Sequence, residues 1–160
     1  MNYRLGGYGD LMDNLEMLSA ASVAGRGAEI VDAYRRCQLQ SVPVPRARGL
    51  INQAFAVFKD EPVRQEKAEM DDLKKNGKDL ATLAPLFKAV SDRDATSFAK
   101  ALDDFLSISW ARQVKGIERF PQYSGKWSIL SAAVCKLLGG VPELSGKTGV
   151  YVPAELVLAK

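Results

Sequence analysis

Carboxylates are the main candidates for chemistry in this chain, because the sequence contains no histidine. Without an imidazole, Ser-His-Asp hydrolases, Cys-His proteases and histidine-containing zinc sites are excluded. The acids concentrate in two places: Glu61, Glu66, Glu69, Asp71 and Asp72 within residues 61–76, and the pair Asp103 and Asp104. Each group lies beside Lys or Arg, a pattern more typical of a solvated helix face than of an acid/base pair. The functional alternative is a docking patch for a partner.

A second motif suggests phosphate binding, since residues 145–148 read Ser-Gly-Lys-Thr. A phosphate-binding loop needs a glycine five positions before its second glycine, and that position is Val141. The segment also follows an expected helix and leads into a tail containing proline, whereas a phosphate-binding loop connects a buried strand to a helix. We therefore do not expect nucleotide binding.

Length and composition indicate one domain over residues 1–160 that can bury a core without disulfides or metals. The net charge of +3 comes from interspersed residues and falls short of the clustered basic surface of a nucleic-acid binder. Cys37 and Cys135 lie in apolar segments that favour buried, reduced thiols. No apolar stretch is long enough to span a bilayer, and acids interrupt any export signal. We expect a cytoplasmic protein without cofactor or metal, and no nucleic-acid or membrane partner.

Apolar residues recur at helical spacing along most of the chain. The pattern predicts helices over residues 11–24, 28–40, 45–60, 78–90 and 126–138, with Leu11, Leu15 and Leu18 on one face of the first, and Leu50, Ile51, Ala54, Phe55 and Phe58 on the core face of the third. It also predicts a long helix from a cap at 91–94 through Trp110 and Val114 toward Gly116, with Phe98, Leu102, Phe105 and Ile108 along its apolar face. Residues 61–76 are expected to form an exposed helix or a partly ordered arm. Residues 150–152 are expected to be extended, because the residue before Pro153 avoids the helical region. The predicted fold class is all-α: a single-domain antiparallel bundle of about six to seven helices with a short extended C-terminal tail.

The last third of the chain carries an ordered series of motifs. The loop of Tyr123, Gly125 and Trp127 leads into an alanine-rich segment that ends in leucine-glycine at 138–139, and the tail reads Tyr-Val-Pro-Ala-Glu-Leu-Val over 151–157. In these features the chain resembles the C-terminal domain of PoNi-type immunity proteins, the partners of polymorphic nuclease toxins delivered by bacterial secretion systems. LEMLSAASVAG, EIVDAYRRC and GLINQAFAVF, at 15–25, 29–37 and 49–58, are similar to the family in order and spacing. A related helical immunity family with a similar tail fits the same residues.

Two departures from that family lie in the loop and in the helix after it. Lys126 stands where an aromatic residue is usual, and Leu130 takes the place of an acid. These changes bear on which toxin would be recognised more than on the fold.

The resemblance implies a non-enzymatic protein that binds and neutralises a cognate bacterial toxin, expected to be a nuclease, by stoichiometric occlusion. Carboxylates can dock against the Lys and Arg side chains of a phosphate-binding site. The candidate contact residues are Glu66, Glu69, Asp71, Asp72, Tyr123, Lys126 and Trp127; no catalytic residue is expected. The alternatives are a carboxylate- or metal-dependent helical enzyme and a helical scaffold or regulator without a toxin partner. The identity of the toxin, the contact face and the oligomeric state are left open by the sequence.

Overall fold

A computed structural model of the chain describes residues 8–36, 45–76, 80–111, 114–115 and 128–158. Every regular element in these ranges is helical, which confirms the predicted all-α class. The α-helices are α1 (Tyr8–Val23), α2 (Gly27–Arg36), α3 (Pro45–Phe58), α4 (Lys67–Asn76), α5 (Leu83–Ser91), α6 (Ala95–Asp104), α8 (Ile129–Leu137) and α9 (Ala154–Leu158). A π-helical segment, Phe105–Trp110, continues α6, and a 3₁₀ turn, Gly149–Tyr151, precedes α9.

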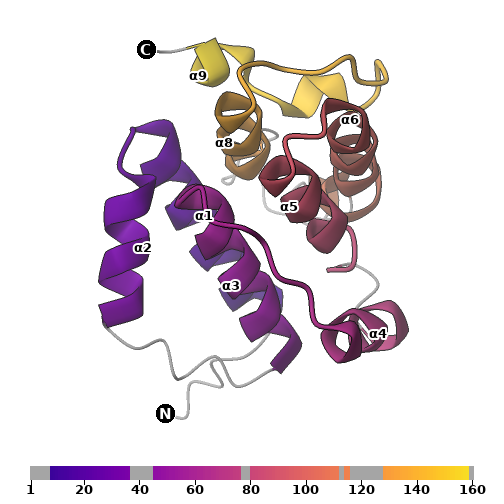
Figure 1. Cartoon of the computed structure of the whole chain (residues 1–160). Coiled ribbons are helices and arrows are strands. Elements are labelled where there is room, and N and C mark those ends of the chain that lie inside the picture. The colour runs from indigo at the N-terminus through magenta and orange to yellow at the C-terminus, as the bar shows by residue number, and fades with distance from the viewer. Residues whose placement is uncertain (1–7, 37–44, 77–79, 112–113, 116–127, 159–160) are drawn as a thin grey trace.

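The helices pack around α1, α3 and α8 (Figure 1). Helix α1 contacts α2, α3 and α8, while α3 also contacts α4 and α5, and α5 packs on α6. Helix α4 lies at the periphery of the molecule, and its main neighbour is α3 (Figure 1). This position gives α4 less support than any helix of the central group receives.

Leucine and phenylalanine side chains at the predicted spacing form the core. Leu11, Leu15 and Leu18 are buried on α1, as predicted, and so is the predicted face of α3 from Leu50 to Phe58. Helix α8 is buried on almost every side, including Cys135. Burial raises the pKa of the Cys135 thiol to about 12, so this residue packs as a small hydrophobe, as expected. Cys37 lies outside the described residues.

The long helix departs from the prediction at its C-terminal half. Phe98, Leu102 and Phe105 are buried, but Ile108 is 48% exposed, so the predicted apolar face is not buried along its whole length. In the π-helical segment each hydrogen bond spans five residues instead of four, which adds a residue to the turn and rotates the side chains beyond it about the helix axis. Ser109 and Trp110 are buried in place of Ile108, and Ser109 Oγ shares a 2.6 Å hydrogen bond with Thr82 Oγ1.

Other predicted boundaries are also corrected. The helix expected from residue 78 begins at Leu83, which places Pro85 in the first turn, where a missing N–H is tolerated. The helix expected from residue 126 begins at Ile129, where the Ser128 side chain caps it by accepting from the Ser131 N–H. In the tail, Val152 is extended as predicted, but Val150 and Tyr151 belong to the 3₁₀ turn and α9 follows Pro153.

Arg93, which follows α5, forms hydrogen bonds to the ends of α3 and α8. Its Nη2 lies 2.8 Å from Asp60 Oδ1, just beyond α3, and its Nη1 donates to the Leu137 carbonyl at the end of α8. Arg93 itself has a φ of 57°, a left-handed conformation that is unfavourable for any residue with a Cβ.

That conformation allows a matched test of backbone strain. Arg93→Ala and Arg93→Gly both remove the guanidinium, so both should destabilise the domain. The glycine variant should be the more stable of the two by about 1 kcal/mol, because glycine adopts a positive φ without strain. Urea unfolding of both variants measures the difference. An alanine variant as stable as the glycine variant would show that the backbone there is not strained.

The Ser-Gly-Lys-Thr segment has a structural role in the tail. Thr148 Oγ1 donates to Asp103 Oδ1 on α6, and Ser145 Oγ donates to the same oxygen at 3.1 Å. Both hydroxyl groups belong to one turn, because the Thr148 N–H donates to the Ser145 carbonyl at 2.9 Å. The turn therefore attaches the segment before α9 to α6, and the carboxylate of Asp103 is used as its acceptor.

This attachment predicts a pH dependence. The Thr148 hydroxyl holds the pKa of Asp103 below its ordinary value, with help from Ser145. A lowered folded-state pKa means that the contribution to stability is present above about pH 4 and is lost as the pH falls below that. Asp103→Asn should lower stability at pH 7 and weaken the decline in stability toward pH 3. Denaturant titrations at several pH values measure this, and an unchanged acid limb would contradict it.

Candidate functional site

Helix α4 is largely exposed, which agrees with the first of the two expectations for residues 61–76, although the helix begins only at Lys67. Leu73 is only 2% exposed and Met70 is partly buried, but most other side chains on the helix face solvent. The segment before α4 is anchored more firmly. The Val63 N–H donates to Ser91 Oγ at 2.9 Å, and the Gln65 amide donates to the Ala84 carbonyl at 2.8 Å. These contacts hold the base of α4 against α5.

A hollow of about 470 Å³ lies between α3 and α4. Its walls combine Gly49, Asn52 and Ala56 of α3 with residues of the α3–α4 connection and the start of α4: Glu61, Pro62, Arg64, Glu66 and Glu69. A Cβ at Gly49 would lie 2.5 Å from Glu69 Oε2. The glycine therefore leaves the space in which the Glu69 carboxylate rests directly against the backbone of α3.

Two acids of this hollow, Glu66 and Glu69, are not paired with any cation that the structure describes, although Arg64 lines the same space. Burial raises the pKa of Glu69, and the neighbouring carboxylate of Glu66 raises it further. Across the described part of the chain, neither the Glu66 carboxylate nor the Glu69 carboxylate has an ion-pair or hydrogen-bond partner. The hollow can therefore accept a cation or a hydrogen-bond donor from outside the chain.

Glu61, at the edge of the same hollow, has its partners within the fold. Its carboxylate is bound by the Arg35 guanidinium of α2 at 2.8 Å and lies 3.8 Å from Lys59 Nζ. These cations, Arg35 first, lower the pKa of Glu61 below its ordinary value. Arg35 also lies over the Phe55 ring. Glu61 thus joins α2 to the end of α3, while Glu66 and Glu69 are left to face the hollow.

The predicted contact residues divide into three groups. Glu66 and Glu69 line the hollow together. Asp71 is exposed and Asp72 half-buried on α4, outside the lining of the hollow. Tyr123, Lys126 and Trp127 lie outside the described residues. Of the second acidic pair, Asp103 is bonded to Thr148 and Asp104 is exposed.

Sequence reasoning missed the wall that α3 contributes. Asn52 and Gly49 come from a helix predicted only as core, and Arg64 comes from the connection before α4. One signal was available for Gly49, since an isolated glycine inside a helical pattern often has a packing reason. No pattern in the sequence indicates that α4 packs beside that glycine.

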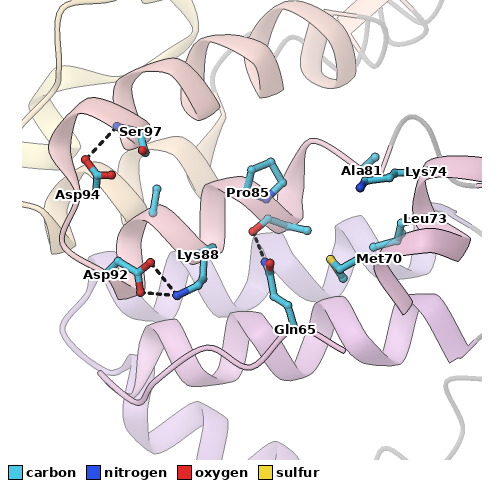
Figure 2. A pocket seen from close by; sticks show the side chains of 12 residues that line it. Gln65, Met70, Leu73, Lys74, Ala81, Pro85, Lys88, Asp92, Asp94 and Ser97 are labelled. Carbon is cyan, nitrogen blue, oxygen red and sulfur yellow. Dashed lines mark hydrogen bonds and ion pairs between the residues drawn. The ribbon is translucent and has the colours of Figure 1, made fainter. Parts of the chain in front are cut away.

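A second hollow, of about 460 Å³, lies on the other side of α4, toward α5 (Figure 2). Met70, Leu73 and Pro85 supply apolar lining. Two of its charged groups form an ion pair, Lys88 Nζ with Asp92 Oδ1 at 2.6 Å. Asp94 caps α6 by accepting from the backbone N–H groups of Thr96 and Ser97, and Figure 2 shows the bond from Ser97. These three charges are therefore engaged within the fold.

The described residues also bear on two other classes of site. They contain no group of three or more Cys, Asp or Glu side chains placed to hold a metal ion. None of their helices combines the length and the apolar character needed to cross a membrane. Comparison of the whole chain with protein-family models, curated proteins and solved structures gave no match.

The hollow between α3 and α4 predicts that one substitution stabilises the protein. A raised folded-state pKa for an acid means that its ionised form is disfavoured by folding, so Glu69 costs stability at neutral pH and the cost disappears as the pH falls. Glu69→Gln should therefore raise the melting temperature at pH 7 and leave it unchanged near pH 3. A lower melting temperature at pH 7 would show that the carboxylate is satisfied in the folded state.

Proposed function

We propose that this protein acts by stoichiometric binding of a partner protein through α4 and the hollow between α3 and α4. One observation carries the proposal: Glu66 and Glu69 repel each other in a partly enclosed space, and among the described residues neither carboxylate has an ion-pair partner, although Arg64 lines the same hollow. A Lys or Arg side chain supplied by a partner would relieve this repulsion and gain a charge-assisted hydrogen bond. A stability cost at a site is typical of surfaces selected for binding.

The proposed partner is a bacterial toxin, and its proposed class is nuclease. A nuclease must attract phosphate, so its active-site region carries Lys and Arg side chains that acids on an inhibitor can occupy. The overall charge of +3 does not help such an encounter, so the attraction has to be local. Helix α4 supplies it, because Asp71 and Asp72 extend the acidic surface beyond Glu66 and Glu69. Neutralisation would follow from occlusion of the toxin's substrate site, with no reaction at this chain.

The test is reconstitution with the proteins encoded beside this one. Each neighbour is co-expressed with the tagged chain, and complexes are analysed by size-exclusion chromatography with light scattering and by DNA cleavage. The proposal expects a complex of defined stoichiometry in which the neighbour's cleavage of DNA is lost, and no cleavage by this chain alone. Cleavage by this chain that is lost on mutation of a carboxylate would favour the enzyme alternative. A chain that binds none of the neighbours would favour a scaffold or regulator.

A further inference from the structure

We draw no further inference here: the strongest candidate, the hollow between α4 and α5 that Met70, Leu73 and Pro85 line, is an unpartnered apolar surface, and nothing in the structure shows what covers it.

Discussion

Replacing Phe105 with alanine is expected to lower the free energy of unfolding by about 3–5 kcal/mol. Phe105 is completely buried and stands where α6 passes into the π-helical segment. Removing its ring leaves a cavity that the surrounding helices can fill only in part. The free energy of unfolding therefore falls both by the transfer free energy of the ring and by the packing contacts that are lost. A domain of this size has about 5–15 kcal/mol of total stability, so this variant should be partly unfolded at modest temperatures.

Two matched variants make the result specific to the buried face. Lys100→Ala lies on the exposed side of α6 and should change stability by less than about 0.5 kcal/mol. Ile108→Ala separates the observed helix from an uninterrupted one. A continuous α-helix would place Ile108 about 60° from Phe105 around the helix axis, at the edge of the buried stripe, and truncating it there should cost about 2 kcal/mol or more. An Ile108 that is 48% exposed should cost less than about 1.5 kcal/mol.

Urea unfolding followed by circular dichroism measures all three variants. The structure predicts a large loss for Phe105→Ala and small losses for the other two. Equal losses for Phe105→Ala and Lys100→Ala would mean that the buried face of α6 is wrong. A loss for Ile108→Ala as large as that for Phe105→Ala would mean that the π-helical segment is wrong.

The sequence predicted most of the helices of this fold but not all of their boundaries and buried faces. Spacing of three and four residues identified the helices and the buried faces of α1 and α3, because burial of an apolar stripe is what stabilises such helices. The prediction failed at Ile108 because a π-helical turn changes the period without changing residue types. The predicted start of α5 was wrong because the apolar pattern continues through residues 80–82, which form a turn before the helix begins at Leu83.

The candidate site was less predictable than the fold. The acids of α4 could be found from composition, but their pairing could not, because it depends on distant helices. Glu61 belongs to the same acidic stretch as Glu66 and is bound by Arg35, 26 residues away, while Glu66 is not. Asp103 likewise became an acceptor for Thr148, 45 residues away. Which acids face an open hollow is a property of the packing between α3 and α4.

The second large effect concerns association with the proposed toxin partner. Neutralising Glu66, Glu69, Asp71 and Asp72 together, as Glu→Gln and Asp→Asn, should slow association by about tenfold or more at low salt, since charge complementarity accelerates encounter. Dissociation should change less where apolar contacts hold the complex. A smaller variant, Glu66→Gln with Glu69→Gln, isolates the hollow and should give part of the effect. Unfolding curves for both variants verify that the fold is intact.

The control variant must neutralise the same number of acids as the Glu66/Glu69 variant, but at another place on the surface. Glu143→Gln with Glu155→Gln also neutralises two acids, and both side chains are exposed outside α4 and the hollow. If the attraction is local to α4, this control should associate with the toxin at nearly the wild-type rate. If it is slowed as much as the Glu66/Glu69 variant, the effect comes from net charge and not from a contact surface.

The most direct measurement of the proposed function is the association rate of the purified chain with the proposed toxin, once reconstitution has identified it, at two ionic strengths, about 20 and 200 mM. Exposed charges are screened over about 20 Å at the lower ionic strength and about 7 Å at the higher one. If α4 makes the contact, the wild-type association rate falls steeply with salt, and the four-acid variant associates more slowly at low salt and depends less on salt. A variant with the wild-type rate and salt dependence would contradict a contact through α4 and its hollow.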